Sequence, residues 1–213
     1  MMTEITLGAA IMAGGQSRRM GTAKEWLDWG GRPLLFQLFE GLRTAGLPCL
    51  VAAGEGSGER WRRLQEQGIE VIRDEGGSHG PVSGICSALK SARKDALLIL
   101  SCDLPFADSR QIMHLAALKQ ELNEWDALIP EAGGRIHPLF ALYHARTLPV
   151  WEEALAARQY RIMSVLEKLR VKRIAEGYLD QWATFNMNTP DDYRRALAER
   201  RRRDALSPGD SNC

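Results

Sequence analysis

The stretch from residue 9 to residue 35, "AAIMAGGQSRRMGTAKEWLDWGGRPLL", carries the pattern that decides the fold. An apolar run, predicted to be a buried strand over residues 5–12, ends in two glycines, and two arginines and a lysine follow. In open α/β sheets, ligands bind beyond the carboxyl ends of the strands. Glycines at such an end let backbone N–H groups approach a polyphosphate. The stretch therefore indicates an α/β protein with an anion site on its first loop.

The apolar run is the first of four predicted strands, over residues 5–12, 49–53, 70–73 and 96–101. Between them, apolar residues recur at helical spacing over residues 33–45, 59–67 and 81–92. This alternation implies right-handed crossovers and a mostly parallel sheet covered on both faces. Later runs at residues 127–130 and 138–143 flank a Gly133-Gly134 turn and predict a small antiparallel addition. We therefore expect a three-layer, Rossmann-like α/β fold.

The C-terminal part is predicted to be helical. Segments 147–157 and 161–169 have helical spacing, and a last helix should begin at Thr189 and Pro190. Threonine is a favoured N-cap residue, and proline is favoured at the first helical position. The arginines of residues 200–203 are interpreted as a solvated helix end and not as a nucleic-acid patch. We expect one domain over residues 1–198 and a basic, disordered tail over residues 199–213.

The composition excludes several classes of partner. Lys and Arg number 28 against 27 Asp and Glu, so no global field attracts nucleic acid or a membrane surface. The longest apolar runs have the length of strands, and the first residues contain no signal-peptide core. No Cys-x-x-Cys pair occurs among Cys49, Cys86, Cys102 and Cys213. Buried thiols in a reducing cytoplasm are therefore expected in preference to a zinc site or a disulfide framework.

The first loop combines bare backbone with mobile cations, supplied by Met12, Ala13, Gly14, Gly15, Arg18, Arg19 and Lys24. Arginine can bind phosphate oxygens bidentately, and lysine acts as a compact point charge. The loop matches neither G-x-G-x-x-G nor G-x-x-x-x-G-K-[ST], which argues against a dinucleotide site and a Walker loop. Phosphate binding is favoured, and a glycine turn with surface basic residues is the alternative.

A second candidate site follows the fourth predicted strand, in "LLILSCDLPF" (residues 97–106). If the first and fourth strands are both central, Asp103 lies beside the first loop. A carboxylate there suits Mg²⁺, which takes few protein ligands and binds phosphates. The alternative is an Asx turn that caps the next helix.

Two further stretches contain candidate ligand-binding residues. In "DEGGSHGPVSGICSAL" (residues 74–89), Asp74 could accept hydrogen bonds from a ribose or a base. Gly80 and Gly84 lie at a helix start, whose unpaired N–H groups favour an anion or a nucleobase edge, whereas His79 is interpreted as a loop residue. In "FNMNTPDDY" (residues 185–193), Asn188 is interpreted as functional and a candidate metal ligand, and Asn186 as part of the turn.

These motifs together resemble the molybdenum cofactor guanylyltransferase family, within the GT-A-like nucleotidyltransferases. The matching segments are "MAGGQSRRMG…K", "GGRPLL", "IRDEGGSHGPVSGI", "LILSCDLPF", "RIHPLFALY", "RQYRIMSVLEKL" and "FNMNTPDDY", which extend to about residue 198. The resemblance implies a GT-A-type fold and an Mg²⁺-dependent reaction in which GTP and molybdopterin form a guanine dinucleotide cofactor and pyrophosphate. Possible further partners are molybdoenzymes or cofactor chaperones.

The resemblance also implies residue roles. Met12, Ala13, Gly14 and Gly15 would wrap the nucleotide. Arg19 and Lys24 would hold its phosphates, and Asp74 would contact the guanosine. Asp103 would hold Mg²⁺, with Asn188 assisting. The basic residues Arg158 and Arg161 would lie on the pterin side.

Other functions remain open at this point. A related nucleotidyltransferase could use CTP or another phosphorylated acceptor, although the Gly14-Gly15 pair favours the guanylyl branch. A nucleotide-binding accessory protein of molybdoenzymes could have lost catalysis, but Arg19, Lys24 and Asp103 argue against this. A glycosyltransferase is disfavoured because Cys102-Asp103-Leu104 lacks the Asp-x-Asp metal motif.

Overall fold

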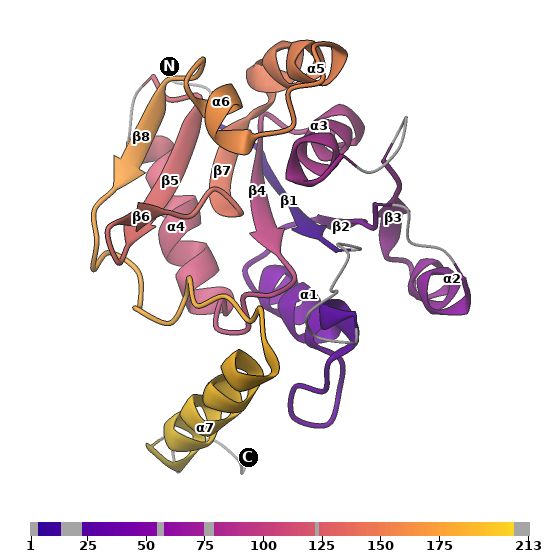
Figure 1. Ribbon diagram of the computed structural model, residues 1–213, viewed down its shortest axis with the longest axis vertical. Coiled ribbons are helices and arrows are strands. Elements are labelled where there is room, and N and C mark those ends of the chain that lie inside the picture. The colour runs from indigo at the N-terminus through magenta and orange to yellow at the C-terminus, as the bar shows by residue number, and fades with distance from the viewer. Residues whose placement is uncertain (1–3, 14–22, 55–57, 75–78, 122–123, 207–213) are drawn as a thin grey trace.

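The protein is a three-layer α/β structure in which helices cover both faces of a central sheet (Figure 1). The computed structural model describes residues 4–13, 23–54, 58–74, 79–121 and 124–206. Within these ranges, eight strands form one sheet. They are β1 (Leu7–Met12), β2 (Cys49–Ala52), β3 (Glu70–Ile72), β4 (Ala96–Ser101), β5 (Ala127–Ala132), β6 (Arg135–Ile136), β7 (Phe140–His144) and β8 (Val171–Ile174).

The strand order places β1 and β4 side by side near the middle of the sheet. The order is β3-β2-β1-β4-β7-β5-β6, and β8 pairs with β5. Strands β3, β2, β1 and β4 are mutually parallel, whereas β7 is antiparallel to both β4 and β5. The sheet is thus mostly parallel with an antiparallel addition, as the sequence predicted.

Helices bury both faces of the sheet. They are η1 (Lys24–Trp26), α1 (Leu34–Thr44), α2 (Glu59–Glu66), α3 (Pro81–Ser91), α4 (Ser109–Glu121), η2 (Ala145–Thr147), α5 (Leu148–Ala156), α6 (Ile162–Leu166) and α7 (Pro190–Leu206). One apolar cluster joins α1, α2 and α4 to the sheet, and a second joins α3, α5 and α6. Consecutive β1 residues alternate between the clusters, with Ala9 and Ile11 in the first and Ala10 in the second. This is why the strand reads as a continuous apolar run.

The four predicted N-terminal strands and the three helices between them are confirmed, with ends shifted by at most two residues. The predicted N-cap is also confirmed. The N–H of Asp192 donates to Thr189 Oγ1 (3.1 Å), and the N–H of Thr189 donates to Asp192 Oδ2 (2.9 Å). This reciprocal cap fixes the start of α7 directly after Asn188.

The predicted disordered tail is wrong for residues 199–206, because α7 continues to Leu206. Glu199 is only 8% exposed and accepts hydrogen bonds from Arg202 and Arg203. Arg203 also pairs with Asp180 and lies over the ring of Phe106. Part of the arginine run is therefore packed against the domain.

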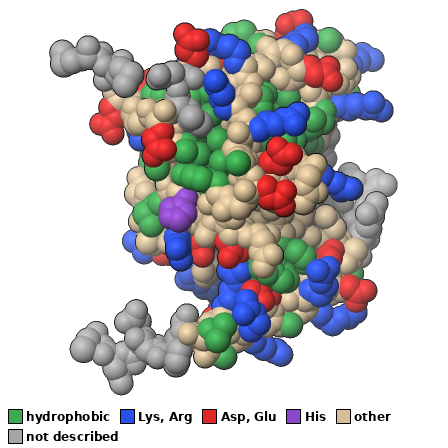
Figure 2. Space-filling model, turned by 90° about the vertical axis from the view of Figure 1, so that its left-hand side faces the viewer, with side chains coloured by type: hydrophobic (Ala, Val, Ile, Leu, Met, Phe, Trp, Pro, Cys, Tyr) green, Lys and Arg blue, Asp and Glu red, His purple; other side chains and the backbone are tan. Residues whose placement is uncertain are grey.

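The surface carries charges of both signs. On the face shown in Figure 2, which views the molecule from the side of β8 in Figure 1, basic and acidic side chains are interspersed. This distribution agrees with the formal net charge of +1. Across the described ranges, no helix has the length and apolar character needed to cross a bilayer.

Candidate functional site

The predicted site residues meet at the carboxyl ends of β1 and β4. These strands pair in parallel up to Met12 and Ser101, and the N–H of Cys102 donates to the carbonyl of Met12 (3.0 Å). Ala13, which follows β1, donates to the carbonyl of Ala52 at the end of β2 (2.8 Å). The start of the first loop therefore lies beside Asp103. The predicted residues Gly14, Gly15, Arg18 and Arg19 lie outside the described residues.

Three predicted side chains form one polar cluster at this edge. Lys24 Nζ lies 2.9 Å from Asp103 Oδ2 and 2.6 Å from Asn188 Oδ1. The side chains of Lys24 and Asp103 are 14% and 11% exposed, so their ion pair is largely shielded from water. The backbone of Asp103 also accepts a hydrogen bond from the N–H of Met187 (2.9 Å). Segments that are far apart in the sequence are thus joined around one ammonium group.

The cluster has the donors that Mg²⁺ prefers. Asp103 Oδ1 is buried and has no hydrogen-bond partner among the described residues. A buried carboxylate oxygen without a partner is costly, and a cation would relieve that cost. Within the described ranges, no group of three or more His, Cys, Asp or Glu has a metal-binding arrangement. The residues therefore fit an ion held by one carboxylate and an amide oxygen, with its other ligands supplied by water and phosphate.

A second group of predicted residues lies around the start of α3. A Cβ placed on Gly84 would lie 2.2 Å from Met12 Cε and 3.8 Å from Asp74 Oδ1. The absence of a side chain at Gly84 thus lets Met12 and the end of β3 approach α3 closely. Gly80 is the N-cap residue of α3 with φ 76°, and a Cβ on it would have no described atom other than those of its chain neighbours within 4 Å. The N–H groups of the first turn of a helix lack partners within the helix, which suits a ligand that accepts hydrogen bonds.

Two buried titratable groups lie beside the cluster: the carboxyl of Glu25, which was not predicted from the sequence, and the thiol of Cys102, which was predicted to be buried. Glu25, next to Lys24 in η1, is 3% exposed. Burial raises the pKa of its carboxyl, although a backbone hydrogen bond and the charges of Arg60 and Lys24 act in the opposite direction. Burial and the neighbouring carboxylate of Asp103 raise the pKa of the Cys102 thiol. In the sequence, the apolar residues Trp26 and Leu27 directly after Glu25 are the signal that Glu25 is buried.

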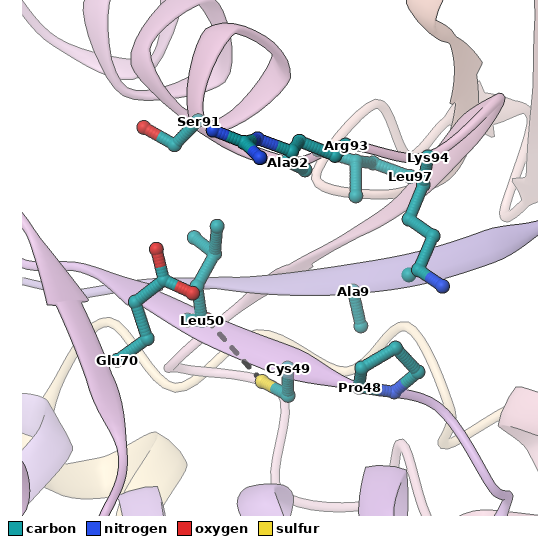
Figure 3. Close-up of a pocket in the computed structure, with 11 residues that line it drawn as sticks. Ala9, Pro48, Cys49, Leu50, Glu70, Ser91, Ala92, Arg93, Lys94 and Leu97 are labelled. Carbon is teal, nitrogen blue, oxygen red and sulfur yellow. Dashed lines mark hydrogen bonds between the residues drawn. The ribbon is translucent and has the colours of Figure 1, made fainter.

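A groove of about 470 Å³ lies elsewhere, between the amino ends of the parallel strands and the end of α3 (Figure 3). Ala9 and Leu50 lie on its sheet side, and Arg93 and Lys94 lie on its α3 side. None of the described site residues lines it.

Comparison with known proteins identifies the family of the chain. A family model for a MobA-like NTP transferase domain matches residues 9–174. The chain belongs to this family. It is therefore a nucleotidyltransferase, and the resemblance seen in the sequence is confirmed.

Similar proteins of this family cover nearly the whole chain. A probable molybdenum cofactor guanylyltransferase of Bacillus licheniformis is 32% identical over 185 residues, which span 85% of this chain and 92% of the relative. A molybdenum cofactor guanylyltransferase of Cereibacter sphaeroides is 35% identical over 193 residues, which span 87% and 93%.

Solved structures show the same fold. Molybdopterin-guanine dinucleotide biosynthesis protein A from Archaeoglobus fulgidus has a TM-score of 0.78 and 25% identity, covering 92% of this chain and 99% of that one. The 2-C-methyl-D-erythritol 4-phosphate cytidylyltransferase from Thermus thermophilus has a TM-score of 0.68 and 18% identity, covering 92% and 100%. The predicted GT-A-type nucleotidyltransferase fold is confirmed.

Proposed function

We propose that the protein transfers GMP from GTP to a molybdopterin-type molybdenum cofactor, with Mg²⁺, and releases pyrophosphate. The observation that carries the proposal is the placement of Lys24 between Asp103 and Asn188 at the carboxyl edge of β1 and β4. The names of the relatives support the choice of substrates. The product would be a guanine dinucleotide form of the cofactor.

The reaction depends on neutralising the charges of the two phosphate groups more than on an activated side chain. The terminal phosphate of the acceptor attacks the α-phosphorus of GTP, and the bond from that phosphorus to the pyrophosphate oxygen breaks. Both reactants are anions, so positioning and charge neutralisation account for most of the rate enhancement. Lys24, shielded from water, would hold the phosphates on the pyrophosphate side, and Arg19 is proposed to act with it. Mg²⁺ held by Asp103 and Asn188 would supply Lewis-acid neutralisation of phosphate charge.

The nucleoside would lie across the second group of residues. Met12, which pairs with β4, and Ala13 would contact the nucleoside, and the sequence candidates Gly14 and Gly15 are proposed to act with them. Asp74 and Gly84 lie close together behind them. The amino end of α3 at Gly80 would supply N–H groups for an electronegative edge of the nucleoside.

Pyrophosphate release tests this proposal directly. The purified protein is incubated with Mg²⁺, the molybdopterin-bearing acceptor and one nucleoside triphosphate at a time. Release with GTP alone is expected. Release with CTP alone would show a cytidylyltransferase, and no release with any nucleotide would contradict enzymatic transfer.

Asp103→Ala is the variant that ties the activity to the site. We expect a rate loss of at least ~100-fold, comparable to the removal of a preorganised electrostatic group. Lys168→Ala is a matched control, since Lys168 forms an ion pair of similar length with Glu153 at an exposed position. Near-normal turnover of Asp103→Ala would remove the carboxylate from the mechanism.

The wider setting follows from the same proposal. A cytoplasmic location, and handover of the product to molybdoenzymes or cofactor chaperones, are proposed with it. Copurification of the chain with a molybdoenzyme, lost on removal of the acceptor, would support the handover.

A further inference from the structure

The rings of His79 and Tyr160 stack on each other. Their centroids lie 4.4 Å apart, and the ring planes differ by 14°. His79 directly precedes the N-cap residue of α3, and Tyr160 lies in the connection between α5 and α6. Tyr160 is 36% exposed although its ring is covered by His79. We call these two residues the ring pair.

The topology places the ring pair at the edge of the sheet formed by the carboxyl ends of the parallel strands. Helix α3 follows β3, which is parallel to β2 and β1, so α3 begins at the carboxyl ends of these strands. Strand β7 is antiparallel to β4 and ends at His144 beside Ala96, so α5 starts from the opposite edge. Helix α5 packs against α3 and leads the chain back towards the start of α3. The ring pair therefore joins the connection that follows α5 to the start of α3, next to Gly80.

Local hydrogen bonds fix the backbone beside each ring of the stack. The N–H of His79 donates to Ser83 Oγ (2.9 Å), and the Ser83 hydroxyl donates to the carbonyl of Gly80 (3.1 Å). On the other side, the N–H of Gln159 donates to the carbonyl of Ala154 (2.8 Å), and Arg158 adopts φ 55°. A non-glycine residue in this left-handed region is uncommon. These bonds restrain the backbone beside both rings, and the stack on His79 orients the ring of Tyr160.

Filling of the core does not explain Tyr160. Tyr143, which does fill the core, is fully buried, and its hydroxyl donates to the carbonyl of Pro138 (2.8 Å). Tyr160 is one of the few large apolar side chains that stay exposed in the described ranges. A ring that is braced on one face and accessible elsewhere is suited to stack on a flat ligand.

We propose that Tyr160, braced by His79, is a specificity-determining platform on which the fused-ring heterocycle of a substrate stacks. The identity of that substrate rests on the proposed function. Guanine and pterin share a 2-amino-4-oxopyrimidine ring, so either could occupy the platform. The exposed cations Arg158 and Arg161 flank Tyr160 in the sequence and suit the phosphate that each ligand carries.

Substitution of Tyr160 tests the platform. Stacking of a base on an aromatic side chain contributes enough affinity that Tyr160→Ala should weaken one ligand by about tenfold or more. Tyr160→Phe should keep wild-type affinity because it keeps the ring. Tyr160→Leu should bind as poorly as Tyr160→Ala because it keeps only apolar bulk.

A matched control lies on the other face of the sheet. Tyr178 is 40% exposed and lies beside His114 of α4, but those rings are 6.4 Å apart and tilted by 59°. Tyr178→Ala should change neither ligand. Thermal melting of each variant separates loss of binding from loss of folding.

The readouts are calorimetric binding of GTP and of free pterin, together with the KM for GTP and for the acceptor. A change confined to GTP assigns the platform to guanine, and a change confined to pterin and the acceptor assigns it to pterin. Unchanged affinity for both, or full rescue by Tyr160→Leu, would overturn the proposal. The binding titrations need no turnover. If the wild-type protein released no pyrophosphate, the proposed function would be contradicted, and the titrations would still test the platform.

Discussion

The ammonium group of Lys24 donates to Asp103 Oδ2 across 2.9 Å in a largely buried ion pair. It thereby occupies one of the two carboxylate oxygens that a metal ion would use, while Oδ1 has no partner among the described residues. If Asp103 holds Mg²⁺ as proposed, Lys24 and the ion would compete for the same carboxylate in the nucleotide-free protein. Binding of a triphosphate would give Lys24 a second anion and release Asp103 to the metal.

This competition predicts opposite effects of Lys24→Ala on metal binding and on rate. Without the ammonium group, Mg²⁺ should stabilise the nucleotide-free protein at lower concentration in a thermal-shift titration. Pyrophosphate release should nevertheless fall at least ~10-fold, because one phosphate-holding cation is lost. Lys168→Ala, at an exposed ion pair, should change neither quantity. A higher Mg²⁺ requirement in nucleotide-free Lys24→Ala would show that the two cations do not compete.

Helix α7 packs against the loop that follows Lys24. The variant Gly30→Ala tests how much this contact contributes to stability. Arg200 lies over the ring of Trp29, and a Cβ on Gly30 would lie 2.0 Å from Arg200 Nη1. Gly30 also has φ 73°, a conformation that costs a non-glycine residue about 1–2 kcal/mol. Gly31→Ala is the control, because Gly31 has φ 90° but, apart from its chain neighbours, no described residue lies within 4 Å of its Cβ position.

In urea unfolding, Gly31→Ala should therefore lose about 1–2 kcal/mol from strain, and Gly30→Ala should lose more. The excess should disappear when both variants are compared in an Arg200→Ala background. Equal losses for the two glycines in the wild-type background would mean that Arg200 moves aside without cost.

Much of the fold could be predicted because parallel strands buried on both faces are continuous apolar runs, as in "ALLILS" of β4. Strand β8 (Val171–Ile174) escaped prediction because two of its residues, Lys172 and Arg173, are exposed and polar. Helix α4 escaped because its buried residues Ile112, Leu115 and Leu118 are mixed with polar ones and with the exposed Met113. In the sequence alone, neither segment can be distinguished from a loop, because each takes up its structure by packing against other elements.

The sequence predicted that Asp103 lies beside the first loop, and the resemblance associated Asn188 with it, but the contacts of Lys24 with both residues could not be predicted. Lys24 and Asp103 each follow a predicted strand, and Asn188 precedes a capped helix. Their meeting depends on β1 and β4 being neighbours and on the bond from Met187 to Asp103, which no local pattern encodes. The stack of Tyr160 on His79 is non-local in the same way. The roles of Gly14, Gly15 and Arg19 stay predictions.

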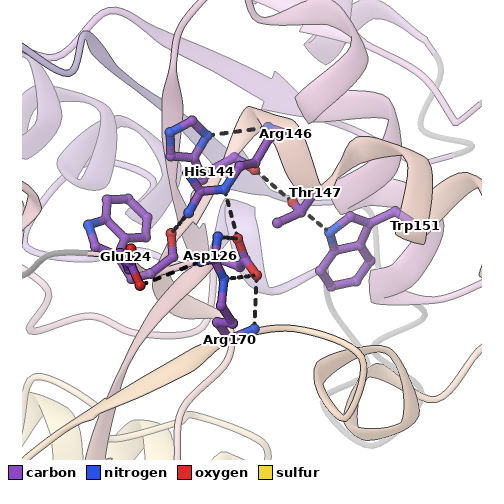
Figure 4. A network of polar contacts seen from close by, with 8 residues as sticks. Glu124, Asp126, His144, Arg146, Thr147, Trp151 and Arg170 are labelled. Carbon is purple, nitrogen blue, oxygen red and sulfur yellow. Dashed lines mark hydrogen bonds and ion pairs between the residues drawn. The ribbon is translucent and has the colours of Figure 1, made fainter. Parts of the chain in front are cut away.

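Asp126 predicts a loss of stability in acid. Its carboxylate accepts hydrogen bonds from Arg146 (2.8 Å) and Arg170 (3.1 Å) in the network of Figure 4. Partial burial acts to raise the pKa of Asp126, but the hydrogen bonds from Arg170 and Arg146 outweigh it and hold the pKa well below its ordinary value. The folded pKa is below the unfolded value of about 3.9, so the stabilisation is complete above about pH 5 and is lost as the pH falls through the folded pKa.

Asp126→Asn should therefore be less stable than wild type at pH 6, and the gap should narrow as the pH falls towards 3. Urea unfolding at several pH values measures the gap. Asp191→Asn is the control, because Asp191 is exposed on the first turn of α7. A gap for Asp126→Asn that stays constant from pH 6 to pH 3 would exclude the carboxylate as the titrating group.

Glu25 predicts the opposite pH dependence. It is 3% exposed, and its Oε2 has no hydrogen-bond partner among the described residues. Burial raises its pKa above the unfolded value of about 4.3, so the folded protein binds this proton more tightly than the unfolded chain does. The contribution to stability is therefore complete below about pH 4 and is lost as the pH rises through the folded pKa.

Glu25→Gln removes that ionisation while keeping the shape of the side chain. The variant should gain stability relative to wild type as the pH rises from 5 to 8, because only wild type has to hold a buried carboxylate there. The difference in melting temperature at each pH measures this gain. Glu66→Gln on the exposed side of α2 should show no such trend. Parallel pH profiles for wild type and Glu25→Gln would mean that the charge of Lys24 or Arg60 fully compensates the buried carboxylate.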